Sequence, residues 1–166
     1  MTGPVGELFR EYHASLVRML TRRTGDVDRA EEIAQEVFAR AVAAPPRNPR
    51  PWLFAVALNL VREEGRREVR QQRRLVLYKA EQPAAFEAPD DAMERGDRQA
   101  LVRAALDQLS ARDRDALLLK AEGFSYDDIA ATLGLARGAV GTTLSRARQK
   151  LVEAYRAGEG RHDIAS

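Results

Sequence analysis

The sequence predicts an all-α protein built as two small helical domains joined by an acidic linker, and three observations indicate this. Ala, Leu, Arg and Glu dominate the 166 residues, and aromatic residues make up only 6%, which favours helices over strands. Apolar residues recur every three or four positions in both halves of the chain, as on one face of a helix. Residues 81–97 break this periodicity with two Pro and six Asp or Glu, which indicates a linker.

The first domain, residues 1–77, is expected to hold three helices. Apolar residues spaced by four indicate a helix over residues 5–24, and Gly25 suits its C-cap. Either of the two Asp residues that follow Gly25 can cap the second helix. Four Pro residues between positions 45 and 51 end that helix, and Pro51 suits the first turn of the third.

The second domain, residues 98–157, is expected to hold four helices and to follow a linker over residues 78–97. Ser-x-x-Asp pairs that begin at Ser110 and Ser125 are signals for two helix starts. The last helix is expected to end near Tyr155, with residues 158–166 as a flexible tail.

Residues 124–151 have the spacing of a helix-turn-helix. Ala130 is small where the two helices would touch, Gly134 tolerates the left-handed backbone of the turn, and Val140 would pack the second helix on the first. The same pattern also fits an ordinary helical hairpin.

The second helix of this motif has few side chains suited to reading bases. A recognition helix places its first residues on base edges, usually with Arg, Asn or Gln, but residues 137–143 carry one charge. The outward candidates are Arg137, Gly141, Thr142, Ser145, Arg146 and Arg148. Arg146, Arg148 and Lys150 form a basic stripe that suits phosphates better than bases. We therefore expect weak DNA binding from this module alone.

The residue inventory argues against an enzyme. The chain has no Cys and only two, isolated His residues, so we expect no metal site. It has no phosphate-binding loop, paired-His zinc motif or nucleophile elbow, so we expect no catalytic residues and no cofactor. Its longest apolar stretch is too short to span a bilayer, and we expect a cytoplasmic protein without membrane insertion.

The motifs together resemble an extracytoplasmic-function (ECF) sigma factor, a promoter-specificity subunit of bacterial RNA polymerase. DRAEEIAQEVFARA (residues 28–41) is similar to the family's core-binding helix, and PWLFAVALN (residues 51–59) to its promoter-melting helix. LDQLSARDRDALLLKAEGFSYDDIAATLGLARGAV (residues 106–140) resembles the domain that reads the upstream promoter element. Two promoter-contacting units on one polymerase would supply the affinity that the last helix lacks.

The resemblance implies roles for two sets of residues in the first domain. Core RNA polymerase would be bound by Glu32, Gln35, Glu36 and Arg40, for which a plain solvated helix face is the alternative. Promoter melting at the downstream element would involve Trp52, Asn59, Arg62, Arg66, Arg67 and Arg70. Asn59 would receive a flipped base, or simply be a polar residue at the helix edge. Trp52 is better interpreted as a core anchor, and the arginines follow DNA phosphates or only solubilise the helix.

We therefore expect an alternative sigma factor whose partners are core RNA polymerase, promoter DNA and an anti-sigma protein. Two other functions remain open. One is a sigma-like decoy that binds an anti-sigma protein without supporting transcription, and the other is a stand-alone helix-turn-helix regulator that binds duplex DNA. The linker would thread toward the polymerase active cleft or serve only as a tether. The oppositely charged blocks around residue 80 raise the hypothesis that the two domains pack together in the free protein.

Overall fold

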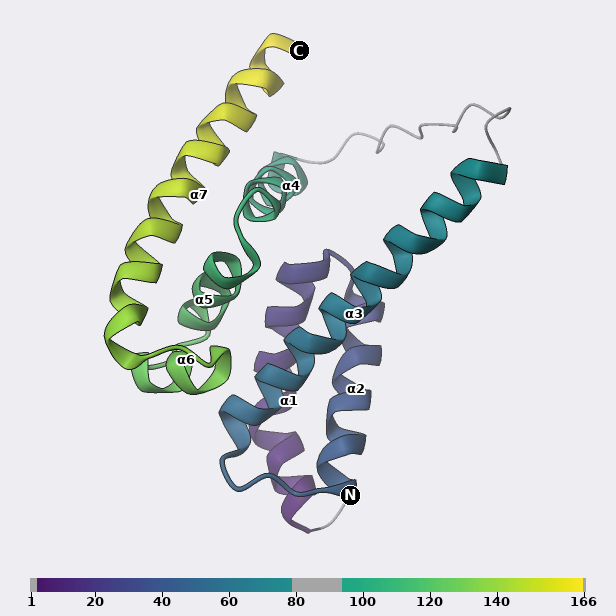
Figure 1. Ribbon diagram of the computed structural model, residues 1–166, viewed down its shortest axis with the longest axis vertical. Helices are drawn as coiled ribbons and strands as arrows, with labels where there is room; N and C mark the ends of the chain where they lie inside the picture. Colours follow the sequence, from purple (N-terminus) through teal and green to yellow (C-terminus); the bar gives the residue numbers. More distant parts are fainter. Residues whose placement is uncertain (1–2, 79–93, 166) are drawn as a thin grey trace.

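The computed structural model describes residues 3–78 and 94–165, and the seven elements in these ranges are all helices (Figure 1). The first unit comprises α1 (Pro4–Thr24), α2 (Val27–Ala43) and α3 (Pro49–Tyr78). The second unit comprises α4 (Glu94–Asp107), α5 (Ala111–Ala121), α6 (Tyr126–Leu133) and α7 (Arg137–Ala165). The predicted all-α class, with three and then four helices, is confirmed.

The capping signals in the sequence set several of these helix boundaries. Gly25 ends α1 with a left-handed backbone (φ 75°), and its N–H bonds to the carbonyl of Thr21 at 2.7 Å. Asp26 is the N-cap of α2 and accepts hydrogen bonds from two backbone amides. Ser110 and Ser125 cap α5 and α6 through the amides of the residues three positions later, as predicted.

Two of the predicted boundaries are wrong. α4 begins at Glu94, inside the range expected to be linker, and residues 79–93 of that range lie outside the described part of the chain. The expected flexible tail is helical to Ala165, because α7 continues through Gly158 and packs there on α4. A Cβ atom at Gly158 would lie 3.5 Å from Cδ2 of Leu101, so the small residue permits a close approach that supports the helix.

The core of the first unit lies between the apolar faces of its three helices. α1 contributes Leu16, Met19 and Leu20, which are fully buried. They pack against the stripes of α2 and α3 that include Ile33, Val37, Phe38, Leu53, Phe54 and Ala57. The apolar stripe of α2 is buried in full, so the opposite side of the helix is left to solvent; the stripe consists of Ala30, Ile33, Ala34, Val37, Phe38 and Ala41.

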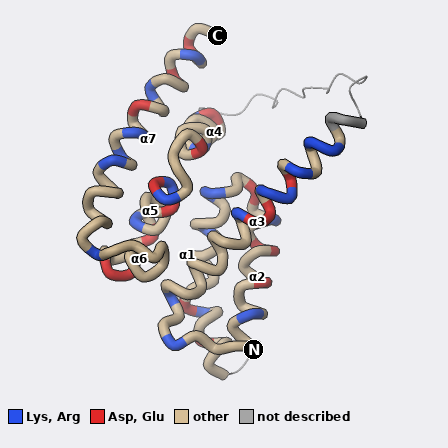
Figure 2. Tube along the Cα trace, viewed as in Figure 1, with Lys and Arg blue, Asp and Glu red and all other residues tan. Residues whose placement is uncertain are grey.

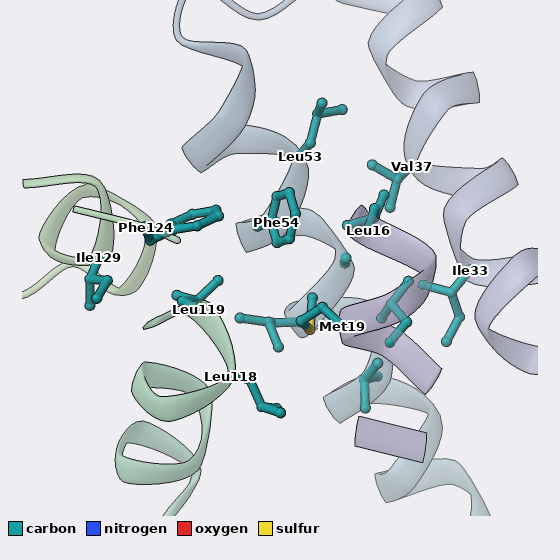
Figure 3. Close-up of a cluster of buried hydrophobic side chains, with 14 of the residues drawn as sticks. Leu16, Met19, Ile33, Val37, Leu53, Phe54, Leu118, Leu119, Phe124 and Ile129 are labelled. Carbon is teal, nitrogen blue, oxygen red and sulfur yellow. The ribbon is translucent and has the colours of Figure 1, made fainter. Parts of the chain in front are cut away.

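The two units pack against each other, through residues other than the oppositely charged blocks around residue 80 that raised this hypothesis. α3 contacts α6 and α1 contacts α5, so buried side chains of both units form one continuous cluster. Figure 3 shows Phe54 of α3 and Phe124, which lies between α5 and α6, pointing toward one another. Their ring centroids are 4.7 Å apart in an edge-to-face arrangement. The described helices include none that is long and apolar enough to cross a membrane.

Candidate functional site

The side of α2 that the resemblance assigns to polymerase is open to solvent. All four predicted residues are exposed: Glu32, Gln35, Glu36 and Arg40. Arg40 donates from Nε to Oε1 of Glu36 at 3.1 Å, one turn away. An exposed pair of this kind contributes about 0.3–0.5 kcal/mol, so a partner can displace it at little cost.

The predicted melting helix α3 presents Asn59 toward the second unit. Asn59 is exposed and borders a cleft of about 330 Å³. The other wall of the cleft is the end of α6 and the turn after it, residues 131–134. Trp52, by contrast, is half-buried and packs against the core cluster, which supports its interpretation as a core anchor.

The arginines of α3 fall into two groups. Arg66, Arg67 and Arg70 are exposed on the carboxy-terminal part of α3, which extends away from both units (Figure 2). Within the described residues, Arg66 and Arg67 form no ion pair. Arg62 lies nearer the units and binds the buried carboxylate of Asp115 on α5. The family resemblance gave all four arginines the same role, whereas in the structure Arg62 is held at the interface between the units and the other three are exposed.

The turn between α6 and α7 has the backbone that a helix-turn-helix requires. Gly134 adopts a left-handed conformation (φ 67°, ψ 35°) and its N–H bonds to the carbonyl of Ala130. Val140 is fully buried and Ala130 is 9% exposed, so the second helix packs closely on the first. The three residues that predicted the motif thus take the positions that the motif needs.

Not every polar side chain on the exposed side of α7 is available to DNA, because some form ion pairs within the protein. Thr142, Ser145 and Arg148 are exposed, and Gly141 is partly covered. Arg137 is exposed too, and its Nε lies 2.6 Å from Oδ1 of Asp127 on α6. This surface pair is screened by water and can exchange for a phosphate.

Arg146 is held by a stronger interaction. Its Nη2 lies 2.9 Å from Oδ1 of Asp113, whose side chain is 1% exposed, and Lys150 approaches the same carboxylate at 3.6 Å. The hydrogen bond from Arg146 is the main reason that the pKa of Asp113 is lowered. Arg146 therefore fastens α7 to α5, a structural role that sequence reasoning missed.

An aromatic residue that sequence reasoning also missed stands beside the reading helix. Tyr126 is 42% exposed, and a Cβ atom at Gly141 would lie 3.6 Å from its Cε2. The ammonium of Lys120 lies 5.6 Å from the ring centre of Tyr126. Tyr126 and Lys120 thus add a stacking surface and a cation next to the weakly charged start of α7.

The ion pairs between the two units are divided by charge. Within residues 3–78 and 94–165, every such pair joins an arginine of the first unit to a carboxylate of the second. Arg103 and Arg114 of the second unit also lie at the interface, near Gly25 and Arg23, but form no ion pair across it in these ranges. The cations are Arg18, Arg22, Arg23, Arg50 and Arg62, and the carboxylates are Asp107, Asp115, Glu122 and Asp128. None of these residues except Arg62 was a predicted site residue.

Glu122 is at the centre of one half of this interface. Its side chain is 2% exposed and accepts hydrogen bonds from Arg18 at 2.8 and 3.1 Å and from Arg22 at 3.2 Å. Its backbone carbonyl accepts a bond from Arg50 at 2.9 Å. The guanidinium of Arg50 also lies 4.2 Å from the ring centre of Phe124, a cation–π geometry.

Asp115 is at the centre of the other half. Its side chain is 1% exposed and pairs with Arg62 across the interface, while Arg114 lies 3.8 Å away on the same helix. Burial raises the pKa of Asp115, although Arg62 acts in the opposite direction. An acid on the apolar face of α5, three residues before the buried Leu118, is the sequence signal that could have revealed this contact.

Comparison with known proteins places both units in one family. Residues 8–74 match the model for "Sigma-70 region 2", and residues 99–151 match the model for "Sigma-70, region 4". The ECF RNA polymerase sigma factor SigL of Mycobacterium tuberculosis is 37% identical over 154 residues, covering 87% of this chain and 84% of SigL. The ECF RNA polymerase sigma factor EcfG of Rhodopseudomonas palustris is 36% identical over 141 residues, covering 77% and 72%.

Two solved structures are similar over most of the chain. One is the sigma factor RpoE in complex with the anti-sigma factor NepR from Bartonella quintana, with a TM-score of 0.57, 28% identity and coverage of 90% of this chain and 97% of that one. The other is CnrH in complex with the cytosolic domain of CnrY, with a TM-score of 0.62, 28% identity and coverage of 92% and 88%. Because both region models match and these two relatives are ECF sigma factors, the chain belongs to the ECF sigma factors of RNA polymerase.

Proposed function

We propose that this alternative sigma factor binds core RNA polymerase through the exposed side of α2 and opens promoter DNA along α3. The α2 surface combines carboxylates, an amide and one guanidinium on a rigid helix, which suits a partner surface of mixed charge. Because its own ion pair is weak, this surface loses little when polymerase covers it. An anti-sigma protein is proposed as a further partner, since the similar RpoE and CnrH structures contain partners of their own.

The melting role is proposed for Asn59 together with the basic part of α3. A base that leaves the stack needs an amide or similar group for its edge, and its strand needs cations for its phosphates. Asn59 is an exposed amide on α3, and exposed arginines follow it along the same helix: Arg66, Arg67 and Arg70. This order on one helix is the observation that best supports the proposed function.

The helix-turn-helix is proposed to bias promoter choice rather than to supply most of the affinity. Thr142, Ser145 and Arg148 are exposed there, and Tyr126 stands beside them. We propose no catalytic residue, metal or cofactor for this chain, and we expect it to act where the polymerase is, in the cytoplasm.

Transcription with purified components tests the proposal. Core RNA polymerase, this protein and a pool of genomic fragments should give discrete start sites that share two upstream motifs. Asn59→Ala should keep the affinity for core and lose most of the transcripts. Glu36→Arg should lose affinity for core, and Glu11→Arg, an exposed position on α1, is the matched control. No transcripts and no binding to core would refute the proposal.

A decoy for an anti-sigma protein is the second candidate, and a specific observation favours it. Two of the predicted reading residues, Arg137 and Arg146, are held by carboxylates of their own unit. Tight binding to core polymerase without any transcripts, or no binding to core but binding to an anti-sigma protein, would support the decoy. Sequence-specific binding to duplex DNA without polymerase would instead support a stand-alone regulator.

A further inference from the structure

An open pocket of about 790 Å³, here named the arginine pocket, lies where the end of α1, the middle of α3 and the start of α5 meet. This volume is within the range of small-molecule sites, about 300–1,000 Å³. The charged side chains that line the pocket are all arginines, one from α1 and three from α3: Arg23, Arg62, Arg66 and Arg70. Within the described part of the chain, no Asp or Glu lines it. The pocket therefore presents positive charge without a matching acid in its wall.

The spacing of the three α3 arginines explains why they line one pocket. They follow each other at intervals of four residues, so they lie in a row on one face of the helix, over about 12 Å of its length. The acids in the same stretch of α3, Glu64 and Glu68, pair with Arg29 of α2 instead. Their negative charge is thus directed toward α2 and leaves the row of arginines unneutralised.

Positive charge is also in excess behind the arginine pocket. Three arginines act on the one buried carboxylate of Asp115: Arg23, Arg62 and Arg114. The Nε atoms of Arg62 and Arg114 are buried without a hydrogen-bond partner within the described residues. Burial lowers the pKa of Arg23, and the nearby charge of Arg114 lowers it further. Asp107 lies 3.9 Å from Arg23, but this acid is 57% exposed and water screens its charge, so a further anion would stabilise the cluster.

The rest of the pocket wall is apolar or belongs to a helix start. Val61 and Val69 of α3 line it, and Val69 is 50% exposed. Ala111, the first residue of α5, lines it too. The first amides of a helix have no carbonyl partner inside the helix and carry the positive end of its dipole, so they favour an anion. Guanidinium groups suit phosphates because they donate two parallel hydrogen bonds.

We propose that the arginine pocket binds a small polyphosphate, which is a molecule with two or more adjacent phosphate groups. Adjacent phosphates fit the row of arginines better than a single phosphate, because the row is longer than one phosphate can span. The site differs from the proposed contact with a DNA strand in its residues, since Arg23 and Ala111 line it and the exposed Arg67 does not. It goes beyond the proposed function, because it requires neither polymerase nor promoter DNA.

Isothermal titration calorimetry of the free, full-length protein with tripolyphosphate tests the site. The wild type should bind one molecule per chain with a Kd below about 1 mM. Arg66→Gln should weaken this binding about tenfold, because it removes a charge-assisted contact from an exposed side chain that the fold does not need. Arg67→Gln is the matched control: Arg67 is the next residue of α3, is also exposed and does not line the pocket, so the Kd should stay unchanged.

A variant on a different helix shows whether the arginines act as one site. Arg23→Gln on α1 should also weaken tripolyphosphate binding about tenfold, with an unchanged circular dichroism spectrum. Equal weakening by Arg66→Gln and Arg67→Gln would indicate a diffuse attraction to the basic helix and would overturn the pocket. The pocket is overturned as well if Arg23→Gln has no effect, or if the wild type shows no saturable binding.

Titrations with ATP and GTP in the same buffer identify the source of the phosphates. Binding about tenfold tighter than that of tripolyphosphate, lost in Val69→Ser, would identify a nucleotide whose base lies on the apolar wall. Affinity equal to that of tripolyphosphate would identify an inorganic chain, and either result supports the site. Binding of single-stranded DNA alone, weakened equally by Arg66→Gln and Arg67→Gln, would assign these arginines to a DNA strand and overturn the proposal. Such a failure leaves the sigma function standing, because the titrations contain no polymerase.

Discussion

Phe124→Leu should weaken the docking of the two units while leaving each unit folded. Phe124 is fully buried, its ring packs edge-on against Phe54, and the guanidinium of Arg50 lies over it. Leu keeps most of the apolar burial but has no ring. An aromatic pair contributes about 0.5–1.5 kcal/mol and a partly exposed cation–π contact about 0.5–1 kcal/mol. The loss is therefore about 1–2.5 kcal/mol, or about a five- to sixtyfold lower docking constant.

Urea unfolding followed by two probes measures this change. Trp52 is the only Trp and lies in the first unit, so its fluorescence reports the unfolding of that unit, while circular dichroism reports all helices. In the wild type, docking couples the units and the two transitions should coincide. In Phe124→Leu, the fluorescence and dichroism transitions should separate.

Phe38→Leu is the matched control, because Phe38 packs edge-on against Phe9 inside the first unit. It should lower both midpoints together, since the docking surfaces are intact. The reasoning would be refuted if Phe124→Leu behaved like this control, with transitions that still coincide. Phe124 would then stabilise one common core rather than the contact between two units.

Three further predictions follow from local features. The pKa of Asp113 is lowered from 3.8, so the ionised carboxylate stabilises the fold at neutral pH. This stabilisation is lost as the pH falls through the lowered pKa. Asp113→Asn should therefore flatten the dependence of the unfolding free energy on pH below about pH 4. Gly134→Ala should lower the free energy of unfolding by about 1–2 kcal/mol, because Gly134 has a left-handed backbone. Gly65 lies inside α3 with open space around it, so Gly65→Ala should raise the free energy of unfolding by up to about 1 kcal/mol in the same thermal unfolding assay. Salt at about 1 M, where the Debye length is about 3 Å, should weaken the docking of the two units and separate the fluorescence and dichroism transitions of the wild type, and transitions that still coincide would contradict an electrostatic contribution to docking.

Local signals in the sequence were sufficient to predict the helices and most of their ends. Capping residues such as Asp26, Ser110 and Ser125 bind backbone amides no more than three residues away, so they can be recognised from the local sequence. The end of α7 was missed because its last turns depend on α4: Gly158 disfavours a helix locally, but the contact with Leu101 is a tertiary one. The exposure of the α2 side followed from helical periodicity and could be predicted too.

The partners of individual side chains could not be predicted in the same way. Arg62 and Arg146 are both basic residues near a DNA-binding motif, and nothing next to them in sequence shows that acids on α5 hold them. Those pairs join residues 53 and 33 positions apart, respectively, so they depend on how the helices pack. The roles given to Glu36 and Asn59 come from the family resemblance and remain predictions.

The divided interface also has a consequence for how this protein responds to nucleic acid in general. Toward the first unit, the carboxylates of the second unit present negative charge to arginines, as a phosphate backbone would, and Asp115 pairs with Arg62. Any long polyanion, such as heparin or RNA without a promoter sequence, competes for the same arginines. Stray nucleic acid must therefore exceed the anionic charge density of these carboxylates before it can displace the second unit from α3.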